Sequence, residues 1–405
     1  MTRAHQVVAW TVGLGLGLAA LGCESAHSST GTGGTGTSST SATTSSATGT
    51  TTASTSTGST QPGLQWFPGN YVLFVGTPSA EATALASFLA SPVAADFDGV
   101  QLTYAWTDFE GGEGDYSAGL TALDMELQAV AAAQKKLILQ VEYKQFGPMA
   151  HAVPAYMRGP GPWCATAQDC GEYQTPNATM PMVWQGLGTG GTADRLQAWL
   201  KAMAAHVASS PERMTVAGFV LPETAVGQGT VSYATVGYTP ASYLTALEGN
   251  ATALLNAAPG IPIFQYINQF SASPPSAAAS DLTYLKSYAE WARAHPPVGI
   301  GCPDVVPGTW GAGYTVPVGY QVLLDEGYQG VLPYNVSIQK SDYLAPRTTG
   351  IDASYGLATQ PATNGMAAPF VNWQDPTPAG AVFALSDVGP YVKAHPDPNT
   401  AQPTY

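Results

Sequence analysis

The stretch LILQVE at residues 137–142 is a short apolar run that follows an Ala- and Leu-rich segment of the sequence. Continuous apolar runs of this length are typical of strands buried on both faces of a parallel sheet. Gln140, Glu142 and Lys144 stand at every second position, so they share one face of the strand. The stretch therefore predicts a buried strand that carries polar groups on one face near its end.

Similar apolar runs recur along the chain, separated by longer segments rich in Ala and Leu. This alternation predicts an α/β fold, a (β/α)₈ TIM barrel of parallel strands. A doubly wound open sheet is the alternative, although no Gly-rich phosphate-binding turn follows the first strand. The expected strands are 71–75, 99–104, 137–142, 216–221, 262–267, 298–302, 330–334 and 370–373. The expected helices are 79–90, 120–134, 193–208, 240–256, 278–294, 314–326 and 379–393.

The N-terminal residues have the pattern of an export signal. Arg3 gives a positive start, and residues 7–21 form an apolar run too short for a membrane-spanning helix. The run ends Ala20-Leu21-Gly22-Cys23, which resembles the lipobox of bacterial lipoproteins. This resemblance implies a signal peptide over residues 1–22, a lipid on Cys23 and an anchored position in the cell envelope, at the outer membrane or cell surface. An ordinary secretory signal is the alternative, and both export the protein.

A low-complexity segment follows the predicted signal. Residues 24–62 are almost entirely Ser, Thr, Gly and Ala, with no aromatic residue. Such a segment cannot bury enough apolar surface to offset the entropy of ordering it. We therefore predict a lipidated Cys and a disordered linker over residues 23–62, and one globular domain over residues 63–405.

The composition favours some partners over others. The 13 Lys and Arg against 27 Asp and Glu give a net charge of −14, which disfavours nucleic acid. The 20 Tyr and 9 Trp favour a saccharide, because sugar rings stack on aromatic faces. The His residues are scattered, so we predict no metal site and no cofactor. We expect a monomer that meets the membrane only through its lipid.

The cysteines of the domain fall into two groups. Cys164 and Cys170 lie close together in a Pro- and Gly-rich segment, and an exported protein can oxidise them to a disulfide. Cys302 lies in an apolar strand context, which predicts a buried thiol.

Acidic residues at strand ends are the first candidates for chemistry, because a barrel builds its active site where its strands end. Glu142 is costly to bury unless it is paired. It either forms a structural pair with Lys144 or contacts the substrate, and both interpretations remain open. Asp108, Glu110 and Glu113 follow the second strand in a Gly-rich loop and are expected to be solvated charges.

Two segments resemble a known clan of enzymes. The fourth expected strand ends Leu221-Pro222-Glu223, and residues 99–106 read GVQLTYAW, followed by GDYS at 114–117. These segments are similar to the barrel glycoside hydrolases that include cellulases and β-galactosidases. The resemblance implies that Glu223 is the general acid/base and that Trp373 floors a sugar subsite.

The sequence departs from that clan in two places. The clan usually has Asn before its acid/base, where this chain has Pro222. Its nucleophile ends the seventh strand, whereas the expected seventh strand ends LPYN at 332–335, without a carboxylate. Asp304 after the sixth strand is then the best partner for Glu223, with Glu142 in reserve. Asp304 could instead cap a turn.

Aromatic and amide side chains also stand at expected strand ends. Gathered around one barrel mouth, they would form a sugar-binding cleft. Each aromatic residue alone is equally suited to packing. The candidate substrate-binding residues are Gln101, Tyr104, Trp106, Tyr143, Gln265, Tyr266, Asn268, Tyr334, Asn335 and Trp373.

These features favour a cell-surface glycoside hydrolase that cleaves an oligo- or polysaccharide with two carboxylates. A non-catalytic glycan-binding lipoprotein on the same scaffold is the alternative, and the missing carboxylate of the seventh strand favours it. A polysaccharide lyase that uses Tyr334 or Tyr143 is a third hypothesis, although the acidic chain makes uronate substrates less suitable.

Overall fold

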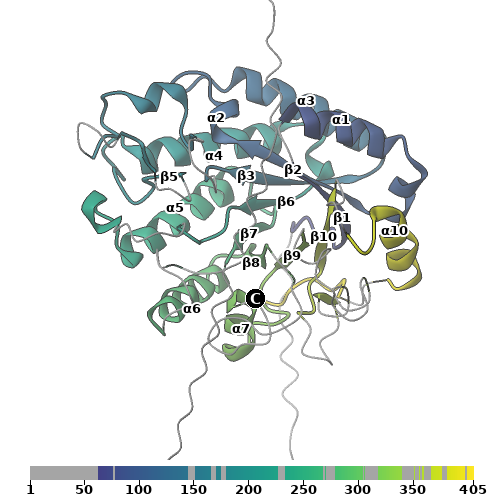
Figure 1. Ribbon diagram of the computed structural model, residues 1–405. Helices are drawn as coiled ribbons and strands as arrows, with labels where there is room; N and C mark the ends of the chain where they lie inside the picture. The colour runs from purple at the N-terminus through teal and green to yellow at the C-terminus, as the bar shows by residue number, and fades with distance from the viewer. Residues whose placement is uncertain are drawn as a thin grey trace, which may run out of the picture. The chain divides into compact units, whose positions relative to one another are not determined.

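Eight parallel strands close into a barrel in the computed structural model (Figure 1). Their order around the wall is β1, β10, β9, β8, β7, β6, β3 and β2. This arrangement confirms the (β/α)₈ barrel, and the open-sheet alternative is wrong. The strands are β1 (Gly69–Phe74), β2 (Gly99–Ala105), β3 (Lys136–Glu142), β6 (Val216–Leu221), β7 (Ile263–Tyr266), β8 (Val298–Cys302), β9 (Tyr334–Ile338) and β10 (Phe370–Asp375).

The structure describes residues 63–75, 78–144, 151–165, 170–174, 179–226, 233–267, 270, 279–303, 305, 318–339, 351, 355, 358–359, 366–375, 381–396 and 399–405. They all belong to one compact unit, residues 57–405. Cys23 and the predicted signal peptide and linker lie outside the described residues. Asp304 and Asn268 also lie outside them.

Helices connect the strands and cover the outside of the barrel (Figure 1). The expected helices are confirmed, with ends that differ by a few residues. Among the described helices, none is long and apolar enough to cross a membrane. The helices are α1 (Pro78–Leu89), α2 (Trp106–Phe109), α3 (Ser117–Ala132), α4 (Thr192–Ser209), α5 (Pro240–Ala257), α6 (Ala279–Arg293), α7 (Val318–Asp325) and α10 (Leu385–Ala394), with short 3₁₀ turns at Pro92–Asp96, Ala155–Arg158, Arg213–Thr215 and Tyr233–Val236.

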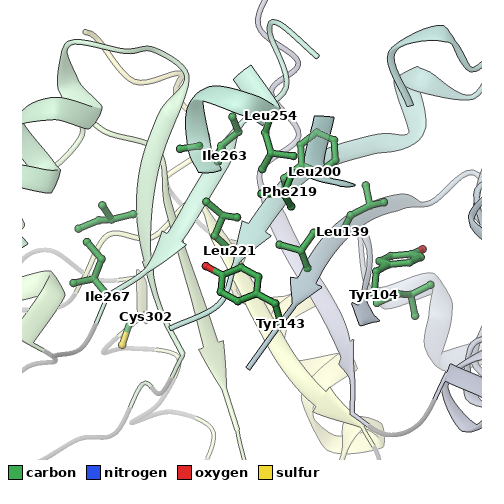
Figure 2. Packing of buried hydrophobic residues seen from close by; sticks show 14 of the residues in the cluster. Tyr104, Leu139, Tyr143, Leu200, Phe219, Leu221, Leu254, Ile263, Ile267 and Cys302 are labelled. Atoms are coloured by element: carbon green, nitrogen blue, oxygen red, sulfur yellow. The ribbon is translucent and has the colours of Figure 1, made fainter. Parts of the chain in front are cut away.

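Each strand sends alternate side chains to the helix layer and to the barrel interior. On the outer side, residues such as Leu139 and Phe219 pack with Leu200 of α4 and Leu254 of α5 (Figure 2). This outer layer is the main apolar core, and it explains why the strands have nearly continuous apolar sequences.

The interior of the barrel has a separate, smaller apolar cluster. Most of its members lie near the amino ends of the strands, where Trp66 and Phe67 pack against them. The cluster therefore fills the amino end of the barrel and leaves polar side chains for the other end. Its buried residues are Tyr71, Ile138, Ala217, Val220, Phe264, Tyr266 and Phe370.

The seventh strand of the barrel begins later than the sequence suggests. Residues 330–333 form a turn, in which the N–H groups of Val331 and Leu332 both donate to the Tyr328 carbonyl. β9 starts at Tyr334, so the expected strand at 330–334 is wrong. The reason is Gly330, which has a φ of 72° and turns the apolar run before it can extend. The carboxyl end of β9 is therefore Ile338.

The connection from β3 to α4 carries an antiparallel hairpin of β4 (Glu172–Gln174) and β5 (Thr179–Pro181). The disulfide between Cys164 and Cys170 lies in this connection and confirms the expected pairing. Cys302 takes no part in a disulfide and is buried, as expected.

Glu110 anchors the same connection, so its expected role as a solvated loop charge is wrong. Its carboxylate accepts hydrogen bonds from Trp106 Nε1 at 2.7 Å and from the Tyr156 hydroxyl at 2.9 Å. It also forms an ion pair with Arg195 of α4. Glu110 is therefore buried because partners from three segments satisfy its charge.

Candidate functional site

A charged cluster lies at the carboxyl ends of β3 and β6, which are neighbours in the wall. It consists of Glu142, Lys144 and Glu223, and we call it the Glu142 cluster. The Lys144 backbone N–H donates to Glu142 Oε1 at 2.8 Å, and Lys144 Nζ donates to the Ala225 carbonyl at 2.7 Å. The second bond ties the end of β3 to the segment after β6 that carries Glu223.

The three charges act on one another in a poorly solvated place. Burial raises the pKa of Glu142 to about 7, and the charge of Glu223 adds to this rise while Lys144 opposes it. Burial also lowers the pKa of Lys144 to about 8, although Glu223 and then Glu142 attract its proton. Glu142 therefore keeps its proton up to about neutral pH, whereas the charges of Lys144 and Glu223 attract each other.

Amide side chains extend this cluster into the barrel. Gln140 lies one inward position below Glu142 and forms a hydrogen bond with its carboxylate. Gln101 of β2 donates to Gln140 Oε1 at 2.6 Å and lies 3.4 Å from the Tyr266 hydroxyl. Tyr266 of β7 also feels the charge of Glu223, so it joins the Glu142 cluster to the opposite wall.

Tyr266 is also the centre of the hydrogen bonds to that opposite wall. Its hydroxyl lies 2.9 Å from Asn335 Oδ1 and 2.6 Å from Ser337 Oγ, both on β9. Asn372 of β10 donates to the same Asn335 oxygen at 2.7 Å. Gly301 of β8 leaves room for the Tyr266 ring, because a Cβ there would come within 2.5 Å of it.

Three buried amide atoms of this network have no hydrogen-bond partner among the residues that the structure describes. They are Gln101 Oε1, Asn335 Nδ2 and Asn372 Oδ1. Buried polar atoms usually find a partner, so these atoms can bind water or the hydroxyl groups of a ligand.

The expected ring of aromatic side chains at the mouth is largely wrong. Tyr104 points to the helix layer, where its hydroxyl donates to Glu126 of α3 at 2.6 Å. Trp106 stacks on Trp199 of α4 with ring centroids 6.0 Å apart. Both belong to the outer apolar core, and the position of Tyr104 is visible in Figure 2.

Three further aromatic candidates also face outward. Tyr143 lies between β3 and α5, and the Asn250 amide lies 3.4 Å from its hydroxyl (Figure 2). Trp373 donates its indole N–H to Asn70 at 3.0 Å, so it cannot floor a sugar subsite inside the barrel. Tyr334 opens β9 and belongs to the outer core. The physical reason is strand alternation, which sends each of them to the side opposite its polar neighbours.

Gln265 lies on the outward-facing positions of β7, with Ile263 and Ile267. Its side chain donates to the Pro222 carbonyl, at the end of β6. It therefore supports the backbone directly before Glu223 instead of pointing into the mouth. Of the ten substrate-binding candidates, Gln101, Tyr266 and Asn335 face the interior network.

Sequence reasoning missed Ser337 and Asn372, which also face the interior. A signal for both was present, because Asn335 and Ser337, like Asn372 and Gln374, are polar pairs two residues apart in apolar strands. The late start of β9 hid the first pair. Among the described residues, no group of three or more acidic, His or Cys side chains could hold a metal ion.

Comparison with known proteins identifies structures with a similar fold. No protein-family model matches the sequence, and no curated protein matches it significantly. The catalytic domain of β-amylase from Paenibacillus polymyxa has a similar structure, with a TM-score of 0.55 and 10% identity over 81% of this chain and 98% of that one. A β-mannanase from the blue mussel Mytilus edulis reaches 0.48, with 10% identity over 84% and 94% of the two chains. The first likeness shows a shared barrel fold.

Proposed function

We propose that this protein is a glycoside hydrolase and that Glu142 and Glu223 are its two catalytic carboxyl groups. One observation carries the proposal: neighbouring strands bring both side chains to one end of the barrel, where they influence each other and Lys144. Glycosidic cleavage needs one protonated and one ionised carboxyl group. The Glu142 cluster supports this chemistry because it places two acids beside one lysine at the same end of the barrel.

The environments assign the roles in the opposite order from the family resemblance. Glu142, with a pKa of about 7, donates its proton to the glycosidic oxygen as the bond to the anomeric carbon breaks. Glu223, which the charge of Lys144 attracts, would supply the carboxylate that acts on the anomeric carbon or on a water molecule. The substrate would be an oligo- or polysaccharide whose hydroxyl groups meet the amides of Gln101 and Asn335.

A glycan-binding protein without catalysis is the second candidate. The carboxyl end of β9 favours it, because Ser337, Ile338 and Gln339 supply no carboxylate where the related clan has its nucleophile. The lyase hypothesis loses its proposed bases, since Tyr143 and Tyr334 both face the outer core.

The proposed location is the cell envelope, with a lipid on Cys23 and a linker that separates the barrel from the membrane. The lipobox-like sequence supports this part of the proposal. In the producing cells, Cys23→Ser should release the protein from the membrane fraction. Equal membrane retention of the Ser variant and the wild type would contradict lipid anchoring.

The catalytic proposal is tested by Glu223→Gln on a panel of neutral glycans, including mannans, β-glucans and starch. The wild type should release reducing ends from at least one glycan, and the variant should lose roughly 10³-fold or more of this activity. Calorimetry should show that the variant still binds the same glycan.

The matched control is Glu290→Gln, which makes the same change on the exposed surface of α6. It should keep wild-type activity. If the wild type binds glycans but releases no reducing ends from any of them, the glycan-binding alternative replaces the hydrolase.

A further inference from the structure

A pocket of about 320 Å³ lies far from the Glu142 cluster. Its walls come from Trp66 before β1, from residues 329–332 before β9, from residues 366–369 before β10, and from residues 399–403. All strands of the barrel run in parallel, so segments that precede strands gather at its amino end. The pocket therefore opens on the face opposite the proposed catalytic site, a face that usually serves stability in barrels of this kind.

The lining of this amino-end pocket combines aromatic and amide groups. Trp66, Tyr334 and Met366 provide apolar surface, and the side chains of Gln329, Asn399 and Gln402 provide amides. None of the described residues that line it carries a formal charge. This neutrality stands out in a chain with a net charge of −14.

Hydrogen bonds hold the walls of the pocket together. Trp66 Nε1 donates to the Thr400 carbonyl at 3.0 Å, and the Asn399 amide donates to the Thr359 carbonyl at 2.7 Å. The Thr404 backbone N–H donates to the Gly330 carbonyl at 3.3 Å, which closes the loop. Trp66 also packs edge-on against Phe370, with centroids 5.1 Å apart, so its ring is fixed before any ligand arrives.

One detail suggests that the pocket is built for a ligand rather than for packing. Ala367, in the wall, has a φ of 48°, a left-handed conformation that costs free energy for a residue with a Cβ. Strain of this kind is frequent where a backbone shapes a binding site.

We propose that the amino-end pocket binds one neutral sugar unit of a glycan, separately from catalysis. The half-buried Trp66 ring offers a surface for the C–H face of a sugar ring, and the amides can exchange hydrogen bonds with its hydroxyl groups. An anionic sugar would find no counter-charge in this lining, and a purely apolar ligand would form no hydrogen bond with its amides. The volume falls within the range of small-ligand sites.

Such a site would hold a polymer at the amino end of the barrel while the Glu142 cluster at the carboxyl end acts on it. Two weak contacts joined by one chain bind more tightly than either alone. The pocket does not depend on the proposed hydrolysis, because it shares no residue with the Glu142 cluster.

The test uses the full chain with ¹⁵N-labelled tryptophan, and Trp66→Phe assigns the Trp66 indole resonance. Neutral hexasaccharides of glucose and of mannose are titrated to millimolar concentrations, beside a hexasaccharide of galacturonate. We expect at least one neutral sugar to shift the Trp66 resonance, and the charged sugar to leave it in place. Gln402→Ala should weaken this binding roughly five-fold through the lost hydrogen bond.

The matched control is Gln128→Ala, on the exposed surface of α3, which should leave the titration unchanged. A Trp66 resonance that no neutral sugar moves would overturn the proposal, and so would an equal response to galacturonate or an unchanged affinity in Gln402→Ala. Failure of the catalytic proposal would look different, because either the wild type would release no reducing ends or Glu223→Gln would keep the wild-type activity, while the Trp66 titration persisted.

Discussion

The two sides of the barrel interior differ in charge. On the side of β3 and β6, Glu142, Lys144 and Glu223 bring formal charges close together. On the side of β7, β9 and β10, the described inward residues beyond the apolar cluster at the amino end carry hydroxyl and amide groups, which are centred on Tyr266. The neutral side is buried, whereas Glu142 and Glu223 are half-buried, and the two sides meet through Gln101 and Gln140.

The difference shows how one lumen can satisfy its polar groups in two ways. The neutral side needs only hydrogen bonds, whereas the charged side needs opposite charges and a raised pKa at Glu142. If the protein performs acid/base chemistry with its described residues, the charged side must supply both acids. The neutral side is better suited to holding the hydroxyl groups of a substrate.

The largest expected effect is on the charged side. Glu142→Gln should lower kcat/KM by roughly 10²- to 10⁴-fold, because an amide cannot donate the proton that the leaving oxygen needs. Wild-type activity should fall as the pH rises through about 7, where Glu142 loses its proton. The measurement is the pH–rate profile of both proteins. A wild-type profile without this fall near neutral pH would remove Glu142 from the acid role.

The same substitution should change how stability depends on pH. Folding raises the pKa of Glu142 from an ordinary 4.5 to about 7, so the folded protein holds this proton more tightly than the unfolded chain. That contribution is complete below pH 4.5 and is lost as the pH rises through about 7. Glu142→Gln should therefore gain stability relative to the wild type over this range in urea unfolding. Parallel pH curves would contradict the raised pKa.

A carboxylate placed on the neutral side tests whether that side must stay uncharged. Asn335→Asp keeps the acceptor for Tyr266 but buries a charge with no described cation beside it, at a cost of roughly 3 kcal/mol at neutral pH. Stability should recover as the pH falls and the new acid is protonated. Asn256→Asp, on the exposed surface of α5, should show neither effect in the same unfolding assay.

A smaller effect separates inward from outward aromatic residues. Trp373→Phe should cost about 1–2 kcal/mol of unfolding free energy, since it loses the hydrogen bond to Asn70 and some buried volume. Its KM for a glycan should not change, because the ring lies in the helix layer. Tyr266→Phe should cost a similar amount and also raise KM. A raised KM in Trp373→Phe would indicate that the Trp373 side chain contacts the substrate at the mouth of the barrel.

The smallest effects concern two residues with a left-handed backbone conformation, one in each half of the barrel. Gln134 after α3 has a φ of 57°, and Ala367 before β10 has a φ of 48°. Replacing each with Gly should raise stability by up to about 1 kcal/mol, because Gly adopts this conformation without a Cβ clash. Thermal unfolding of both variants gives the comparison. A loss of stability in either variant would show that its side chain contributes more than its strain costs.

Much of the fold could be predicted because buried strands have continuous apolar sequences. The strands 216–221 and 298–302 match their observed bounds, since apolar runs end where the chain leaves the wall. β9 was misplaced because GVLP is as apolar as a strand, and only its turn at Gly330 shows otherwise. That shift moved Tyr334 and Asn335 from the end of a strand to its beginning.

The candidate site was harder to predict because it depends on which way side chains face. Gln101, Glu142 and Asn335 were found, since a polar residue in an apolar strand stands out. Tyr104, Tyr143 and Trp373 were misassigned, since an aromatic ring suits a core and a sugar site equally. Glu110 was missed because its partner Arg195 is distant in sequence and enters from α4.

The sequence by itself determined the class of fold, the position of most elements and the polar residues of the third strand, because periodicity and burial act locally along the chain. Only the tertiary structure decided that Glu223 lies near Glu142 and Lys144, and that Trp66 and Tyr334 line a pocket at the amino end. The physical reason is that closure of the barrel sets the distances between strands, and a pKa or a pocket depends on neighbours that come from different strands.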